Sequence, residues 1–182
     1  MEKFETELGY IANPEIRAWA KKCVDQIPEY FFHSPASSTG KYHPSYALGD
    51  GGLYRHTKAA VHIARDILNL EQYGCFSQDD KDYAIMALIL HDSRKSGEFE
   101  GYTKFEHPML ASEAVQKIVP HDIAERVCPL IESHMGQWNI SNRSSVVLPT
   151  PKSALQQIVH LADYLASRKY LVVPFDGNEV MV

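Results

Sequence analysis

The pair His91-Asp92 directly follows an apolar run, AIMALIL, at positions 84–90. A helix that is apolar on every face belongs in a protein interior, so we expect the pair to be buried. Buried imidazole and carboxylate groups are unfavourable unless another group satisfies them. A divalent cation is a common partner for adjacent nitrogen and oxygen ligands. The sequence therefore predicts a metal site here, whereas the second such pair, His121-Asp122, is expected only to begin a helix.

Length and charge limit what the rest of the chain can be. Its 182 residues, of which 45% are hydrophobic, fit one domain over residues 1–182, with the motifs within about 50–170. The formal net charge is -5, which predicts no general attraction to nucleic acid or to an anionic membrane.

The cysteines and the first residues indicate the compartment. Cys23, Cys75 and Cys128 are odd in number, widely spaced and set in apolar sequence, which indicates buried free thiols in a reducing environment. The opening MEKFE lacks a signal-peptide core, and no apolar stretch reaches about 18 residues. We therefore expect a cytoplasmic protein without membrane contact.

Helical patterns recur along the whole chain. Asn13-Pro14 and Ser77 are typical of helix starts, and Pro129 is expected to kink or split its helix. The predicted helices cover approximately residues 14–26, 53–70, 77–91, 108–119, 122–134 and 151–169. Residues 33–52 predict a long ordered loop that could form the wall of a site, and the tail could add a short extended piece. The predicted fold class is all-α, a bundle of about six or seven helices.

Helix phase distinguishes candidate ligands from other histidines. His56 shares a helix face with apolar residues four, seven and eleven positions later, so it should face the core. Asp163 lies in the apolar stripe of its helix, where an unpaired carboxylate would be strongly unfavourable. His134 continues another apolar stripe. His107 precedes a proline at a helix start, where it could cap the helix or face a cleft.

Each of these residues also has a purely structural interpretation, because a histidine on an apolar face is more often hydrogen-bonded than metal-bound. Their occurrence in order on separate helices favours metal binding. The remaining histidines are expected to be ordinary. His62 should be solvated or hydrogen-bonded to a ligand, and His160 could orient Asp163. The others are His33, His43 and His121.

With these residues in place, the chain resembles the HD-domain metal-dependent phosphohydrolase superfamily over about residues 30–170. The superfamily's signature is a histidine, then His-Asp, then a later aspartate, on an all-helical bundle. It maps to His56, His91, Asp92 and Asp163, and His107 and His134 match the additional histidines of versions with two metal ions. The strings GGLYRHT at 51–57 and LADYLA at 161–166 are similar to the HD domain of Gram-positive 3′-to-5′ exoribonucleases.

Two departures from the resemblance bear on the substrate. Those exoribonucleases carry an OB-fold before the HD domain, for which 182 residues leave no room, and Ser93-Arg94 replaces residues that are usually small or apolar. The resemblance therefore implies an intracellular hydrolase of a nucleotide, dinucleotide or short oligonucleotide. The alternatives are a 3′-5′ exonuclease without an OB-fold and a noncatalytic HD module that binds a nucleotide or a partner protein.

The resemblance also implies roles for individual residues. Two divalent ions (Fe, Mn, Co, Ni or Zn) would activate water, with Asp92 shared between them and catalytic. Lys95 would act with it by neutralising phosphate charge. Candidate substrate-binding residues are Lys41, Arg55, Trp138 and Arg168, with Arg143 and Lys152 as further cations and Tyr42 or Tyr46 as further aromatic rings for a base. The expected partner is a small phosphorylated substrate, with no obligate protein partner.

Overall fold

A computed structural model describes residues 3–37 and 39–181 of the chain. Within these residues the chain forms seven α-helices and one two-stranded antiparallel hairpin, which confirms the all-α prediction. The helices are α1 (Glu5–Gly9), α2 (Pro14–Val24), α3 (Gly52–Leu68), α4 (Gln78–Leu90), α5 (His107–Gln116), α6 (His121–Glu132) and α7 (Ala154–Ala166). The strands are β1 (Phe175–Asp176) and β2 (Glu179–Val180), and the 3-10 turns are η1 (Glu29–Phe32), η2 (Ser45–Ala47), η3 (Glu71–Tyr73) and η4 (Gly136–Trp138).

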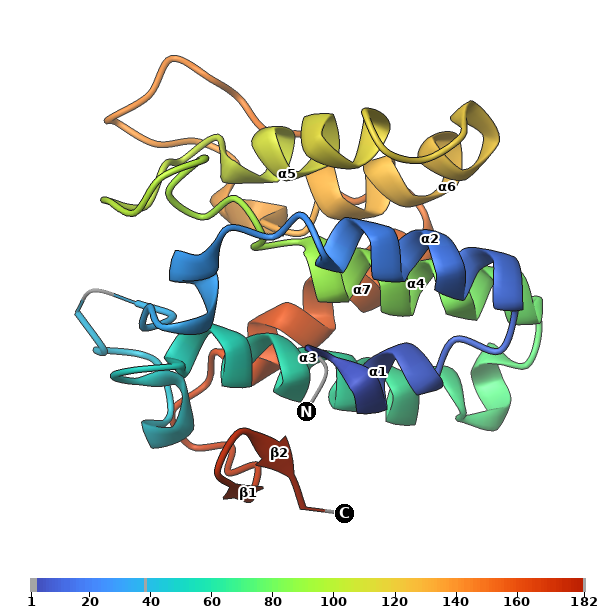
Figure 1. The fold of residues 1–182 in the computed structure, drawn as a ribbon, viewed down its shortest axis with the longest axis horizontal. Coiled ribbons are helices and arrows are strands. Elements are labelled where there is room, and N and C mark those ends of the chain that lie inside the picture. Colours follow the sequence, from blue (N-terminus) through green and yellow to red (C-terminus); the bar gives the residue numbers. More distant parts are fainter. Residues whose placement is uncertain (1–2, 38, 182) are drawn as a thin grey trace.

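Helix α4 lies at the centre of the bundle and contacts α2, α3, α6 and α7 (Figure 1). Helices α5 and α6 pack against each other on one side of α4, and α1 and α3 lie on the other side. Helix α7 packs along α3 and also contacts α4 and α6. This arrangement places the C-terminal end of α4, where His91-Asp92 follows, among elements from the whole chain.

Two helix starts follow the predicted capping chemistry. The Asn13 side chain accepts hydrogen bonds from the backbone N–H groups of Glu15 and Ile16, and Ser77 forms a capping box with Asp80. Pro129 does not split its helix, since α6 continues through it. The short α1 was not predicted.

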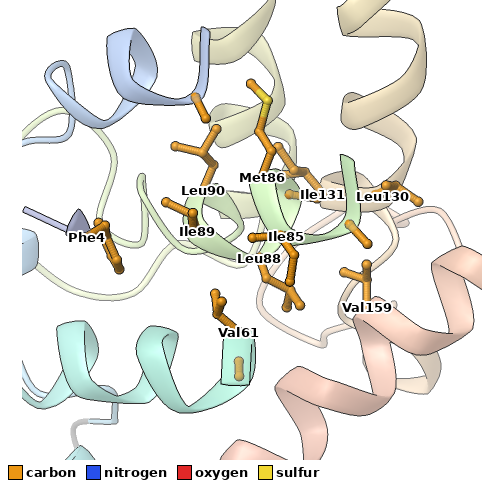
Figure 2. Packing of buried hydrophobic residues seen from close by; sticks show 14 of the residues in the cluster. Phe4, Val61, Ile85, Met86, Leu88, Ile89, Leu90, Leu130, Ile131 and Val159 are labelled. Atoms are coloured by element: carbon orange, nitrogen blue, oxygen red, sulfur yellow. The ribbon is translucent and has the colours of Figure 1, made fainter. Parts of the chain in front are cut away.

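The core is built from the apolar residues of α4. Ile85 and Leu88 point toward Val61 of α3 and Val159 of α7, while Met86 lies on the α6 side (Figure 2). All five side chains are at most 3% exposed. Because apolar residues surround α4 on every side, the polar pair at its end is buried as well.

Two polar networks hold α3 in place. Arg55 donates from Nε to the Tyr46 carbonyl at 2.6 Å and from Nη2 to the Leu48 and Asp50 carbonyls at 3.1 and 2.8 Å. It thereby orders the predicted loop, of which residue 38 lies outside the described part of the chain. Lys58, 1% exposed, contacts Glu179 Oε1 at 2.6 Å and the buried Glu7 at 3.3 Å, which ties α1 and the hairpin to α3.

Two sequence-based expectations are wrong at this level. Cys75 is exposed, unlike the buried thiols Cys23 and Cys128, because it lies in the turn before α4. His62 is neither solvated nor near the predicted ligands, since it is buried beside Glu7 and Tyr10. None of the helices in the described residues has the length and hydrophobicity needed to cross a membrane.

We predict that Leu88→Ala lowers the free energy of unfolding by about 2–5 kcal/mol, because it leaves a cavity beside α4. Leu161→Ala is the matched control, since Leu161 is 41% exposed whereas Leu88 is fully buried. Urea denaturation measures both variants. Equal losses would contradict the central position of α4 in the core.

Candidate metal centre

The structure brings all six predicted ligands together. They come from five parts of the bundle: His56 from α3, His91 and Asp92 from the residues that follow α4, His107 from the first residue of α5, His134 from just beyond α6, and Asp163 from α7. The first five are at most 2% exposed, and the Asp163 side chain is 19% exposed. The cluster is therefore almost closed to solvent, with Asp163 at its accessible side.

One part of the cluster is centred on Asp163. Its Oδ1 lies 2.9 Å from His56 Nε2 and 3.4 Å from His91 Nε2. The three donor atoms are close enough together to hold one metal ion.

The other part is centred on Asp92. Its Oδ1 lies 3.0 Å from His107 Nε2 and 3.8 Å from His134 Nε2, and its Oδ2 lies 2.5 Å from Lys95 Nζ. His91, Asp92 and His134 form a second group whose donor atoms could hold an ion. His91 thus belongs to both groups, and the two carboxylates lie on either side of it.

Main-chain carbonyls orient three of the imidazole rings. The Nδ1 atoms of His91, His107 and His134 lie 2.7 Å from the carbonyl oxygens of Leu88, Lys104 and Ile131, each three residues earlier. When such a ring is neutral and donates its Nδ1–H to this carbonyl, its Nε2 carries no proton and can bind a metal. Metal-binding histidines are oriented by the same type of hydrogen bond.

This orientation leaves acceptor atoms facing one another. His107 Nε2 and His134 Nε2 are only 3.3 Å apart, and both are near Asp92 Oδ1. Among the described residues, the buried atoms His91 Nε2 and Asp92 Oδ1 have no hydrogen-bond partner. Several lone pairs converging in a buried space are unfavourable without positive charge. The donor set therefore fits a divalent metal ion bound by imidazole nitrogen and carboxylate oxygen.

The protonation states of Asp92, Asp163 and His134 agree with this fit, whereas in the metal-free cluster Asp92 and Asp163 raise the pKa of His91 despite its burial. Burial alone would raise the pKa of Asp92, but Lys95 and His91 hold the pKa well below its usual range. Burial likewise opposes ionisation of Asp163, whose pKa is lowered by hydrogen bonds from two histidines. Burial, together with the charge of His91, lowers the pKa of His134 to about 3. Ionised carboxylates and a neutral imidazole are the forms that bind metals.

A comparison with protein families matches residues 53–168 to the HD domain. The chain belongs to the HD domain family. HD domains are members of a metal-dependent phosphohydrolase superfamily and bind divalent metals, in agreement with the donor set described above. No curated protein and no solved structure matches the chain. The similarity to exoribonucleases therefore stays a prediction.

The predicted substrate-binding residues fall into two groups. Lys41, Trp138 and Arg168 lie along one row of rings and cations at the surface, whereas Arg55 is engaged with the loop carbonyls. In this row Trp138 stacks on Tyr164 with ring centroids 5.4 Å apart, and the Arg168 guanidinium lies 4.3 Å from the same ring. Lys41 and Arg168 both lie over Tyr42, at 5.1 and 6.0 Å. The row includes Tyr164, the residue that follows Asp163 in α7.

Two other histidines behave differently from their predictions. His43, expected to be ordinary, lies with its ring centroid 5.6 Å from that of His56, and its Nδ1 is buried without a hydrogen-bond partner among the described residues. Burial and the nearby His56 lower the pKa of His43 to about 4. No periodic signal could have identified it, because it lies in an irregular loop. His160 does not orient Asp163; its Nδ1 donates to the His134 carbonyl at 2.7 Å.

The contact between His160 and the chain after His134 requires a glycine. Gly136 has φ +57°, a left-handed conformation, and a Cβ at this position would lie 2.2 Å from the His160 ring. The close approach of Gly136 to α7 therefore fixes the segment that carries His134.

We predict that Mn²⁺ raises the melting temperature of the metal-stripped protein, because a cation offsets the clustered lone pairs. At a concentration about 100-fold above Kd the stabilisation is about 2.7 kcal/mol, or roughly 5–10 °C. Differential scanning calorimetry should show a smaller increase for His107→Ala. The control His121→Ala should keep the full increase, because the His121 side chain is 88% exposed. A melting temperature independent of Mn²⁺ and of chelators would contradict the metal site.

Proposed function

We propose that this chain is a metal-dependent phosphohydrolase that cleaves a phosphoester bond of a nucleotide, dinucleotide or short oligonucleotide. The observation that carries the proposal is the buried cluster in which His91 Nε2 and Asp92 Oδ1 have no hydrogen-bond partner among the described residues. A purely structural cluster would be expected to satisfy these atoms internally. Family membership supports the reaction class, and the substrate is our inference.

The cluster contains enough donors for two divalent ions. His56, His91 and Asp163 would hold one ion, and His107 and His134 would hold the other. Asp92 would be shared, since its two carboxylate oxygens face different neighbours. When bound, such ions lower the pKa of water and polarise phosphoryl oxygens.

Lys95 connects the cluster with the space outside it. Its ammonium lies 2.5 Å from Asp92 Oδ2, while the side chain is 19% exposed. A positive charge at this boundary can attract the substrate phosphate and stabilise the negative charge that develops during attack by water. Because Lys95 also holds the pKa of Asp92 down, it keeps that carboxylate ionised. We therefore assign Lys95 to phosphate binding and Asp92 to the metals.

A second candidate function, 3′-5′ exonuclease activity on a single strand, is favoured by the row of rings and cations from Lys41 to Trp138. Exposed rings and cations are typical of proteins that bind single-stranded nucleic acid. The row includes Tyr164, the residue after Asp163 in α7, so a strand bound along the row would pass this helix. Hydrolysis of dinucleotides compared with longer strands would distinguish the two candidates.

We predict that Asp92→Asn lowers the rate of hydrolysis of bis(p-nitrophenyl) phosphate and of a dinucleotide at least about a hundredfold. The amide keeps the shape of the side chain but removes the shared negative charge. Asp122→Asn is the matched control, because Asp122 also follows a histidine but is exposed. It should keep the wild-type rate.

An unchanged rate for Asp92→Asn in a preparation free of contaminating nucleases would overturn the enzymatic proposal. Binding of nucleotides without turnover, with each of the candidate metals, would instead identify a noncatalytic HD module.

A further inference from the structure

A pocket of about 280 Å³ lies directly outside the cluster, and Lys95 contributes to both. Its walls come from η1, the turn after α4 and the loop before α7, with Tyr30, Tyr102 and Arg143 among the lining residues. A larger hollow of about 460 Å³, between α2 and the end of α5, contains no residue of the cluster. Of these two hollows, the smaller one shares Lys95 with the cluster and is therefore placed to hold part of a molecule that reacts there.

Arg143 is a cation without a partner in the described residues. Its guanidinium forms no ion pair or hydrogen bond there; only its backbone N–H is engaged, with Ser141. By contrast, Arg55 and Arg94 both donate to main-chain carbonyls. Arg143 and Lys95 thus contribute two positive charges to the lining of the pocket, which also contains the carboxylate of Glu100. Of the two cations, Lys95 is paired with Asp92 and Arg143 is not paired with a carboxylate of the described residues. A guanidinium with free donors is suited to a phosphate group.

The pocket also has an aromatic wall. Tyr102 is 95% exposed, so its ring can stack on a ligand without being displaced from the core. Tyr30, which also lines the pocket, is fixed because its hydroxyl donates to the Gly97 carbonyl at 2.9 Å and accepts from the Ser96 N–H at 3.1 Å. A ligand with an aromatic base and a phosphate would contact both the tyrosine and the arginine.

The volume limits how much of a substrate can enter. At about 280 Å³ the pocket is slightly smaller than the usual range for small-molecule sites, roughly 300–1,000 Å³. One nucleotide unit fits this size, whereas a longer strand does not.

We propose that this pocket binds one nucleoside phosphate unit of the substrate, with Arg143 on its phosphate and Tyr102 stacked on its base. The inference rests on the proposed function, because it assumes that the reaction takes place at the cluster beside Lys95. It makes Arg143 and Tyr102 specificity-determining residues that act on the substrate and not on the metals.

The test is calorimetric binding of adenosine 5′-monophosphate and of inorganic phosphate to the metal-loaded protein, with the integrity of the nucleotide checked afterwards. Arg143→Gln should weaken binding of both ligands about tenfold or more, since it removes a charge-assisted hydrogen bond. Tyr102→Ala should weaken binding of the nucleotide about fivefold or more and leave phosphate binding unchanged, because only the base can stack.

Two controls match these variants. Lys117→Gln removes the same charge from an exposed site outside the pocket, and Tyr170→Ala removes a ring that is 75% exposed elsewhere. Both should bind like the wild type. For hydrolysis, Arg143→Gln should raise KM with little change in kcat, and metal content should stay constant in all variants.

If Arg143→Gln and Tyr102→Ala both bind the nucleotide with wild-type affinity, the proposal that the pocket binds a nucleoside phosphate is wrong. This holds even if Asp92→Asn still abolishes hydrolysis. Equal weakening of phosphate and nucleotide binding in Tyr102→Ala would also overturn it, because it would show a general structural effect. If the wild type hydrolyses no phosphoester but binds the nucleotide through Arg143 and Tyr102, the proposed hydrolase function is wrong, whereas the proposed nucleotide binding in the pocket is supported.

Discussion

The convergence of imidazole nitrogens and carboxylate oxygens at the end of α4 is the interaction on which the remaining structure depends. Main-chain carbonyls fix the rings of His91, His107 and His134 so that their Nε2 atoms point inward. Asp92 meets these nitrogens in a space from which solvent is nearly excluded. Such an arrangement is unfavourable by itself and becomes favourable with bound cations. The apolar bundle makes the site possible because it excludes water and holds five separate helices around it.

Much of this site could be predicted from the sequence. His56 and Asp163 follow the helical periodicity of the apolar residues around them, and that periodicity determines which side chains face the core. The cluster therefore assembles as expected once the helices pack. The starts of α2 and α4 could likewise be predicted from the capping residues Asn13 and Ser77, because a cap depends only on local hydrogen bonds.

The rest depends on contacts between residues far apart in the sequence. Arg55 was a candidate for substrate binding, but its guanidinium is directed to carbonyls of the preceding loop and to Asn178. His43 lies beside His56 only because that loop folds back over α3. The pocket with Arg143 and Tyr102 is formed by two irregular segments, for which no periodic pattern exists. Local sequence signals cannot specify such neighbours.

The most direct test of the metal site is mass spectrometric measurement of metal content in anaerobically purified protein, beside the His107→Ala variant. We predict about two ions per chain for the wild type and about one for the variant, because His107 belongs to the group around Asp92. A single ion that is unaffected by the substitution would contradict the two-ion site. No metal, even after reloading, would contradict the account as a whole.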